Sequence, residues 1–273
     1  MPEMPEVETI KNELLPHIIG RQITGVTLLW GRILRQPHLD EFRSRIIGRR
    51  ITGTSRRGKY LILNLDSSDQ LILHLKMSGS LLIKLESVKS DDKYTRAVFH
   101  LDNETAIHFR DPRKFGVIWL VKDEEEVVGE LGPEPLESDF TPQILAERLN
   151  KRTTLIKALL CDQNFIAGMG NMYADEALFL SKIHPLKMGG NLSPKEISRL
   201  HHAIREVLKT AIDNKGASIA DYYRPSGELG AAHFEFKVAH RRGENCPTCG
   251  TPIQRIAVRS RGTYFCPKCQ TAN

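Results

Sequence analysis

The first half of the chain begins with a helical pattern and continues with short alternating runs. Val7, Ile10, Leu14 and Ile18 recur at three- and four-residue spacing, which predicts an amphipathic helix that Gly20 can end. Six β-like runs follow, separated by polar or glycine-containing breaks: 59–65, 70–77, 80–85, 95–101, 105–109 and 116–121. Several short strands at about ten-residue spacing indicate a β-sandwich or barrel.

The second half changes to a helical period. The candidate helices are 144–149, 154–161, 172–180 and 194–214. Ser193 is the expected N-cap of the last one, because its hydroxyl can accept a hydrogen bond from an unpaired backbone N–H of the first turn. The tail after about Lys237 is short and hairpin-like. The expected fold class is therefore α+β: a β-sandwich with a flanking helix, a helical domain and a C-terminal hairpin.

Composition narrows the class of protein. Hydrophobic residues make up 40% of the 273 and charged residues 26%, which is ordinary for a soluble globular protein. No run approaches the roughly 18 to 20 apolar residues of a membrane span, and the start lacks the pattern of a signal peptide. We therefore expect neither membrane insertion nor secretion. The net charge of +6 is compatible with a polyanionic partner.

Charge is unevenly distributed along the chain. Residues 123–147 hold nine acidic residues and no Lys or Arg, and they include the helix-breaking run GPEP. Charge runs are usually solvated, so we interpret this one as a linker. Residues 237–273 carry seven Lys or Arg against one Glu. The expected division is a β domain over 1–122, the linker over 123–147, a helical domain over 148–236 and the basic tail over 237–273.

The strongest local motif is a pair of CxxC turns in this tail. Sixteen residues separate the two pairs, which are Cys246 with Cys249 and Cys266 with Cys269. At this spacing the four thiolates can bind one Zn²⁺ tetrahedrally, one pair from each end of a hairpin. Disulfides are the alternative, but nothing in the sequence indicates an oxidising compartment. The motif predicts a closed structural zinc site on a hairpin that also carries Arg255, Arg259 and Arg261.

The N-terminus holds an unusual pair of residues. Pro2 is small enough for Met1 to be removed, which would leave a secondary amine as the chain terminus. An α-amino group has a pKa of about 7.7–8.0, far below that of lysine, so an appreciable fraction is the free base at neutral pH. Such an amine attacking a sugar C1′ gives a cationic iminium, and Glu3 beside it can transfer protons. The alternative is that Pro2 and Glu3 only begin a helix.

Two further segments combine glycine, aromatic or basic residues. The turn GMGNMY (168–173) precedes a helical pattern, and a helix N-terminus after glycines can bind phosphate, although an ordinary turn between helices is the alternative. The segment FRDPRKFG (109–116) suits phosphate contact and insertion between bases, or it is simply a loop between strands. His74 at an alternating strand position favours packing or hydrogen bonding over a ligand role, and Cys161 favours a buried thiol.

Three segments together resemble the bacterial formamidopyrimidine-DNA glycosylases of the Fpg/endonuclease VIII family. They are the start MPEMPEVET, the turn 168–173 with Glu176, and the tail segment RGTYFCPKCQ (261–270). Their order and spacing match over essentially the whole chain, so the resemblance is specific where each motif alone was weak. It implies a helix–two-turns–helix motif in the helical domain, a zinc ribbon in the tail, and a loop over about 216–231 that closes over a damaged base.

The resemblance also implies roles for individual residues. Pro2 would be the nucleophile and Glu3 the catalytic carboxylate. The implied catalytic set is completed by Lys59 and Arg261, with Glu6 and Glu176 in a proton relay. The implied DNA contacts are Lys59, His74, Met77, Arg113, Phe115, Lys157, Asn171 and Arg261. Of these, Met77 and Arg113 would fill the space of a flipped nucleotide, with the Arg facing the orphan cytosine, and Phe115 would wedge the next step.

The implied function is base excision repair. The protein would be a bifunctional DNA glycosylase and AP lyase that removes 8-oxoguanine and formamidopyrimidines through a Pro2 Schiff base and β,δ-elimination. It would need no cofactor beyond one structural zinc ion. Its partner would be double-stranded DNA containing oxidised bases or abasic sites. We expect a monomer in the bacterial cytoplasm, associated with the nucleoid during repair.

Two alternatives stay open. One is an endonuclease VIII-type glycosylase for oxidised pyrimidines, which the set Met77, Arg113 and Phe115 disfavours. The other is a zinc-ribbon protein that binds damaged DNA without cleaving it, which the pair Pro2 and Glu3 disfavours. Cleavage of duplexes containing either type of lesion distinguishes the three.

Overall fold

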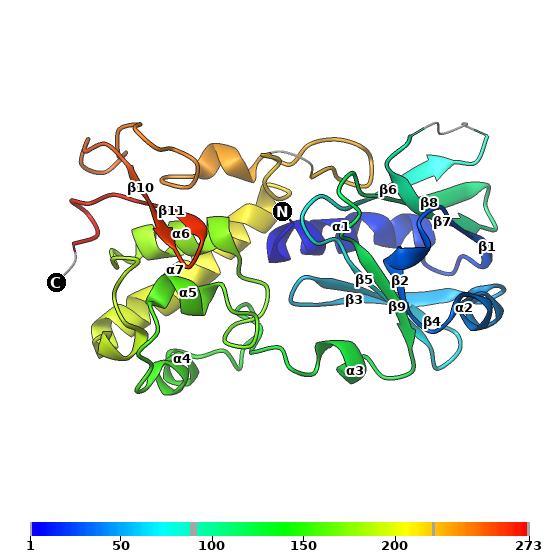
Figure 1. Cartoon of the computed structure of the whole chain (residues 1–273), viewed down its shortest axis with the longest axis horizontal. Helices are drawn as coiled ribbons and strands as arrows, with labels where there is room; N and C mark the ends of the chain where they lie inside the picture. The colour runs from blue at the N-terminus through cyan, green and yellow to red at the C-terminus, as the bar shows by residue number, and fades with distance from the viewer. Residues whose placement is uncertain (1, 88–91, 220–221, 272–273) are drawn as a thin grey trace. The chain divides into compact units, whose positions relative to one another are not determined.

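The computed structural model describes residues 2–87, 92–219 and 222–271 (Figure 1). The chain forms two compact units. The N-terminal unit comprises Met1–Glu130 with Asn214–His233, and the C-terminal unit comprises Leu131–Asp213 with Phe234–Asn273. The expected α+β fold is confirmed, with the sheets in the first unit and the helices and a hairpin in the second. No helix in the described ranges is both long and apolar enough to cross a membrane.

The N-terminal unit contains two sheets and the helix α1 (Met4–Ile18). One sheet has the antiparallel order β1-β7-β8-β6, with β1 (Ile23–Leu28), β7 (Thr95–Leu101), β8 (Thr105–Arg110) and β6 (Ser80–Leu85). The other has the order β2-β9-β5-β4-β3, with β2 (Leu34–Gln36), β9 (Val117–Val121), β5 (Gln70–His74), β4 (Tyr60–Leu65) and β3 (Ile51–Arg57). Only β2 and β9 pair in parallel among the described strands. Short helices complete the unit: η1 (Gly31–Ile33), α2 (Leu39–Ile46) and α3 (Glu125–Val128).

Strand alternation explains how these sheets share a core. Leu61 and Leu63 of β4 lie in the main apolar cluster, which also contains Phe99 of β7 and Ile10 of α1. Ile62, between the two leucines, belongs to a separate cluster on the other face. Successive side chains of a strand point to opposite faces, so β4 packs apolar residues on both sides. Helix α1 is thereby held against the sheets, which fixes the position of its N-terminus.

The six predicted strands are confirmed, but other elements of the N-terminal unit were missed. They are the strands β1, β2 and β3 and the short helices η1, α2 and α3. Strands β1 and β3 lie at sheet edges, and β3 has only Ile51 buried, so it lacks the apolar alternation that identifies a strand. Strand β5 ends at His74 instead of Met77, because Lys76 adopts a positive φ of 54° that turns the chain.

The C-terminal unit is built around an almost fully buried helix. Helix α6 (Asn171–Leu180) packs against α7 (Pro194–Asp213), α5 (Ile156–Leu160) and the hairpin β10 (Gln254–Val258) and β11 (Arg261–Phe265). Helix α4 (Pro142–Leu149) packs on α7, and η2 (Gly189–Asn191) and η3 (Ala232–Glu235) are short 3₁₀ turns. All four expected helices are confirmed. The Ser193 hydroxyl accepts from the Glu196 N–H at 3.4 Å, as expected for the N-cap of α7.

Candidate functional site

The N-terminus of α1 holds the predicted nucleophile and its carboxylate neighbour. Pro2 is buried, and Glu3 is 1% exposed. Glu3 is the N-cap residue, and a reciprocal capping box joins it to Glu6, whose Oε2 accepts the Glu3 N–H at 2.7 Å. Pro2 and Glu3 therefore do begin a helix, and the same cap gives the Glu3 backbone a fixed position. The positive end of the helix also favours a negative charge there.

Glu6 connects this end of α1 to a segment more than 200 residues further along the chain. Its side chain is fully buried, and its Oε1 accepts the N–H of Ala217 at 2.8 Å. Gly216 has a φ of +75°, and a Cβ there would lie 2.9 Å from Glu6 Cγ and Oε1. Glycine at 216 thus permits the close approach of this backbone to Glu6. The predicted lesion-covering loop 216–231 starts at this point, with residues 220–221 outside the described part of the chain.

Lys59 lies in the turn between β3 and β4. Arg56 holds this turn against α1, because its guanidinium donates to Glu8 at 2.8 Å and to the Gly58 carbonyl at 2.9 Å. Lys59 itself is 7% exposed. An ion pair therefore fixes the turn that carries Lys59 to helix α1.

His74 lies close to Lys59 and Lys76 and is uncharged at neutral pH. Its Nδ1 accepts the N–H of Lys76 at 2.9 Å, and its ring packs edge-on against Tyr60. Burial, followed by the charges of Lys76 and Lys59, lowers the pKa of His74 to about 3. The expectation of a packed, hydrogen-bonded histidine is confirmed. Contact with DNA through the other ring nitrogen remains a prediction.

Met77, Arg113 and Phe115 are presented on two loops of the N-terminal unit. Met77 is 42% and Phe115 48% exposed, and Arg113 is also exposed. The Arg113 guanidinium lies over the Phe115 ring at 4.9 Å, a cation–π contact that aligns the two side chains. Exposed apolar groups with an arginine beside them are suited to insertion between bases.

In the C-terminal unit, Asn171 and Arg261 are joined through the zinc hairpin. Asn171 is the first residue of α6, and its Nδ2 donates to the Gly262 carbonyl at 2.8 Å. Arg261 begins β11, directly before Gly262. It also lines a hollow of about 530 Å³ together with three further basic residues, Arg152, Lys157 and Arg259. Helix N-terminal N–H groups next to a basic hollow are suited to bind phosphate.

Lys157 has an internal set of partners. It is 1% exposed, and its Nζ donates to Asp175 Oδ1 at 2.6 Å and to the Asn171 carbonyl at 2.5 Å. The other Asp175 oxygen accepts the N–H of Tyr264 in β11 at 3.0 Å. The pair therefore fixes the start of α6 to the hairpin. Burial raises the pKa of Asp175 to about 6, although Lys157 and the Tyr264 N–H oppose the shift. A direct phosphate contact by Lys157 remains a prediction.

Glu176 anchors the segment that leads to the zinc hairpin. Its carboxylate accepts three consecutive N–H groups, those of Lys237, Val238 and Ala239, at 2.8–2.9 Å. Burial raises the pKa of Glu176, while these three bonds oppose the shift. A part for Glu176 in a proton relay remains a prediction. The three hydrogen bonds give Glu176 a role in holding the backbone of residues 237–239.

The four cysteines of the tail form a site that fits zinc. All four Sγ atoms lie within 4.8 Å of one another, with 3.9 Å between Cys246 and Cys269 and 3.4 Å between Cys249 and Cys266. Four sulfurs about 2.3 Å from a tetrahedral zinc ion would be separated by about 3.8 Å. One zinc ion would be bound by all four thiolates. A site closed in this way is structural, because it leaves no coordination position open for substrate.

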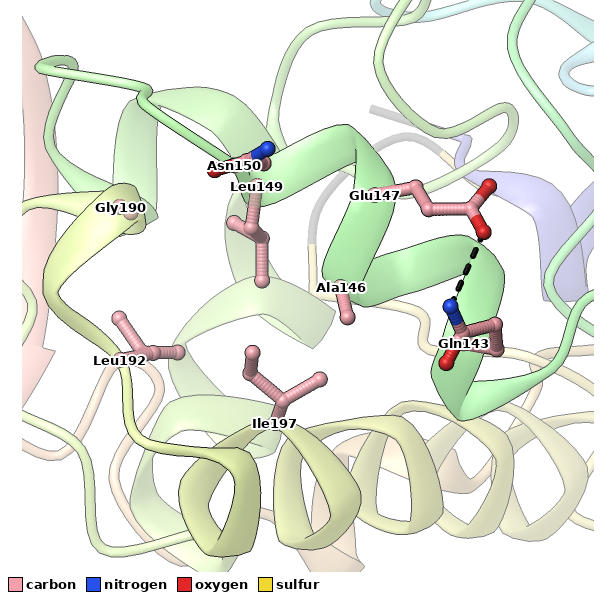
Figure 2. A pocket seen from close by; sticks show the side chains of 9 residues that line it. Gln143, Ala146, Glu147, Leu149, Asn150, Gly190, Leu192 and Ile197 are labelled. Carbon is pink, nitrogen blue, oxygen red and sulfur yellow. Dashed lines mark hydrogen bonds between the residues drawn. The ribbon is translucent and has the colours of Figure 1, made fainter.

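A second hollow of the C-terminal unit lies between α4 and α7 (Figure 2). Leu149, Leu192 and Ile197 point into it, and Gln143 donates to Glu147 at 3.1 Å on one side. None of the residues that the sequence singled out lines this hollow. It therefore lies apart from the candidate site.

Sequence reasoning missed the ion pair that fixes the loop 216–231 to α1. Arg224 donates from Nε and Nη2 to Glu13 at 2.7–3.1 Å, and Tyr222 of the same loop is buried in the main core. Arg224 also bonds Glu228 at 2.7 Å. Glu13 and Arg224 are 211 residues apart, so no local spacing could have paired them.

Comparison with known proteins agrees with this arrangement. Three family sequence models match: the formamidopyrimidine-DNA glycosylase N-terminal domain at residues 1–118, the formamidopyrimidine-DNA glycosylase H2TH domain at 131–222, and the zinc finger found in FPG and IleRS at 243–272. These matches define a DNA glycosylase with the N-terminal domain of this family, a helix–two-turns–helix domain and a zinc finger.

Whole-chain relatives identify the family. The formamidopyrimidine-DNA glycosylases of Chloroflexus aurantiacus and Chloroflexus aggregans are 48% and 46% identical to this chain, over 99% of it and 98% of each relative. Lactococcus lactis Fpg (MutM) in complex with DNA containing N7-benzyl-Fapy-dG superposes with a TM-score of 0.93 at 36% identity, over 99% of this chain and 100% of that one. MutM bound to DNA containing carbocyclic 8-oxo-G gives 0.92 at 36% identity with the same coverage. The chain belongs to the formamidopyrimidine-DNA glycosylase family.

Proposed function

We propose that this protein is a bifunctional DNA glycosylase and AP lyase that removes oxidised purines from duplex DNA. The observation that carries the proposal is the buried pair Pro2 and Glu3 at the N-terminus of α1, in a chain that belongs to this family. Solved relatives bind DNA that contains Fapy-dG, an 8-oxo-G analogue or an abasic site. Oxidised-base and abasic-site duplexes are accordingly the proposed substrates.

The proposed chemistry begins after removal of Met1. The free secondary amine of Pro2 attacks C1′ of the damaged nucleotide, the bond from C1′ to the base breaks, and the base leaves with a proton. Glu3 is the proposed proton donor to the departing base or to the sugar ring oxygen, and the bond from C1′ to this oxygen then breaks to leave the iminium. The resulting iminium is cationic and accepts electron density when a proton is lost from C2′ and the 3′ phosphate leaves. A second elimination releases the 5′ phosphate and leaves a one-nucleotide gap.

DNA binding is proposed to use phosphate contacts from both units. Lys59 in the β3–β4 turn, Asn171 at the start of α6 and Arg261 on β11 are the proposed phosphate ligands. Met77, Arg113 and Phe115 would fill the stack after the nucleotide flips out, which offsets a cost of a few kcal/mol. The zinc ion, when bound, supplies no reaction chemistry and keeps the hairpin that carries Arg261 folded.

The remaining proposals concern organisation and location. The residue divisions 1–122, 123–147, 148–236 and 237–273 are proposed as catalytic domain, acidic linker, helix–two-turns–helix domain and zinc finger. The loop 216–231 is proposed to cover the damaged base, and Glu6 and Glu176 to relay protons. A monomer acting on DNA in the bacterial cytoplasm is the proposed working form.

Borohydride trapping followed by peptide mass mapping tests the function. On a duplex containing 8-oxoguanine opposite cytosine, we expect a covalent adduct on an N-terminal peptide that begins with Pro2. Pro2→Gly should abolish the adduct. An adduct only on thymine-glycol DNA would assign the protein to oxidised pyrimidines. Retained binding with no adduct on either lesion or on an abasic site would make it a non-catalytic damage binder.

A further inference from the structure

Asp111 is a fully buried carboxylate that accepts four hydrogen bonds. It follows β8 directly and begins the loop that leads to β9. Oδ1 accepts from the Ser78 hydroxyl at 2.5 Å and the Arg113 N–H at 3.1 Å. Oδ2 accepts from the N–H groups of Phe115 and Gly116, both at 2.7 Å. Every donor belongs to the N-terminal unit and comes from one of two loops.

These donors are placed beside the three exposed side chains of the same loops. Arg113 and Phe115 supply their own backbone N–H groups, and Ser78 directly follows Met77. One carboxylate therefore joins the loop that carries Met77 to the loop that carries Arg113 and Phe115. These are the side chains proposed to enter the DNA stack.

The backbone around Asp111 is itself held from a second direction. The buried Arg96 guanidinium donates to the Asp111 carbonyl at 2.7 Å and to the Lys93 carbonyl at 2.9 Å. A Cβ at Gly116 would lie 2.5 Å from the Phe109 ring and 3.2 Å from Asp111 Oδ2, so glycine permits this close approach. The loop is thus fixed by its own hydrogen bonds before any ligand binds.

We propose that Asp111 is the positioning residue that aims Met77, Arg113 and Phe115 into the space left by a flipped nucleotide. This inference rests on the proposed function. Asp111 is buried and acts through the two loops, with no contact of its own to the DNA. Because the three side chains are ordered before DNA binds, binding does not have to include the entropy cost of ordering them. More of the free energy of their contacts with DNA can then keep the damaged base from restacking.

The chemistry of the site calls for a carboxylate. All four partners are donors, so each oxygen must accept two hydrogen bonds. Asp111→Asn keeps the size of the side chain but supplies one oxygen, and its NH₂ group faces two donors. The amide therefore retains one pair of bonds at most and releases part of one loop. Ser78→Ala removes only the connection to the Met77 loop.

The experiment compares two single-turnover rates for each variant, with wild-type enzyme as reference. One is release of 8-oxoguanine from a duplex with cytosine opposite, and the other is strand cleavage at a preformed abasic site. Flipping the nucleotide out of the duplex costs least at an abasic site, because the damaged base is already missing there. A defect in the insertion of Met77, Arg113 and Phe115 should therefore lower the rate of 8-oxoguanine release more than the rate of abasic-site cleavage. Asp69→Asn is the matched control, a buried aspartate of the same unit that pairs with Arg45 at 2.6 Å instead.

For Asp111→Asn we expect base release to fall by about tenfold or more and abasic-site cleavage by less than about threefold. Ser78→Ala should give a smaller loss of the same kind, and Asp69→Asn should leave the ratio of the two rates unchanged. A 2-aminopurine placed next to the cytosine that faces the lesion should lose its unstacking signal in Asp111→Asn. Equal losses on both substrates, or no loss, would overturn the positioning role.

The outcomes separate this inference from the proposed function. If wild-type enzyme releases no oxidised purine, the function itself fails. If wild-type enzyme is active and the ratio of rates stays constant in the variants, only the role of Asp111 fails. Should Asp111→Asn not fold, Ser78→Ala decides alone: an unchanged ratio in that variant contradicts the connection between the two loops.

Discussion

The Glu6 carboxylate accepts the N–H of Ala217 at 2.8 Å, which joins the N-terminal end of α1 to the start of the loop 216–231. The other oxygen of the same carboxylate accepts the Glu3 N–H at 2.7 Å. One buried side chain therefore sets two backbone positions, one beside the proposed nucleophile and one at the root of the proposed lesion cover. Glu6 therefore connects these two segments directly.

Glu6→Gln should destabilise the protein and slow base release together. Glutamine has one acceptor oxygen, so its NH₂ group would face one of the two donors, and a buried N–H left unpaired costs about 1–3 kcal/mol. The free energy of unfolding in urea and the single-turnover rate of base release measure the two effects. Glu206→Gln, at a half-exposed position of α7, should change the unfolding free energy by less than about 0.5 kcal/mol. Wild-type values for Glu6→Gln would contradict this role.

Protonation of His74 should destabilise the protein in mild acid. Its pKa is lowered to about 3 by burial and by Lys76 and Lys59, whereas an unfolded histidine has a pKa near 6.5. The unfolded state therefore binds more protons as pH falls from about 6.5 toward 3, and stability falls with it. Between pH 7 and 5 this histidine should account for a loss of about 1–2 kcal/mol.

The variant His74→Asn tests this pH dependence. The Asn oxygen can still accept the Lys76 N–H, but it cannot take up a proton. We expect its unfolding free energy to change less between pH 7 and 5 than that of the wild-type protein. His202→Asn, at a position that is 81% exposed, should keep the wild-type dependence. Parallel curves for His74→Asn and wild type would show that His74 is not the responsible group.

The buried pair of Lys157 and Asp175 should be strongly coupled. Lys157→Met leaves the Asp175 charge without its 2.6 Å partner, and breaking a buried ion pair from one side costs about 3–5 kcal/mol. Adding Asp175→Asn should recover much of this loss, because the amide oxygen can still accept the Tyr264 N–H. A double-mutant cycle in urea measures the coupling, with exposed Lys209→Met as control. Additive losses for the pair would argue against the coupling.

The features of this protein that could be predicted from the sequence are those that depend on the spacing of residues close together in the chain. Cys246 and Cys269 were assigned to one metal site because two CxxC turns carry their geometry with them. The capping residue Ser193 was found for the same reason. In contrast, β3 carries mostly polar residues at a sheet edge, where few side chains need to be buried, so its sequence pattern is weak.

Residues that act through distant contacts could not be assigned from the sequence. Asp111 stood inside a motif that was noted for its cations and aromatics, but its four donors become apparent only when the chain is folded. The pair Glu13 and Arg224 is 211 residues apart. The family resemblance placed Lys157 among the DNA contacts, but its buried ion pair with Asp175 in the next helix becomes apparent only in the folded chain. Pairings across the fold follow from packing, which one sequence does not reveal.

The salt dependence of DNA binding should distinguish the charged phosphate ligands from the neutral one. Each phosphate neutralised by Lys or Arg releases counterions. The logarithm of the binding constant therefore falls more steeply with the logarithm of the salt concentration. Lys59→Ala and Arg261→Ala should each weaken binding and reduce the magnitude of the slope by about 1. Asn171→Ala should weaken binding but leave the slope unchanged, since its amide carries no charge. The slope is measured between about 50 and 200 mM salt on abasic-site DNA, with Lys209→Ala as the control for loss of a remote charge. An unchanged slope in Lys59→Ala would remove Lys59 from the phosphate contacts, and a reduced slope in Asn171→Ala would mean that this substitution disturbs the Arg261 hairpin through the lost bond to Gly262.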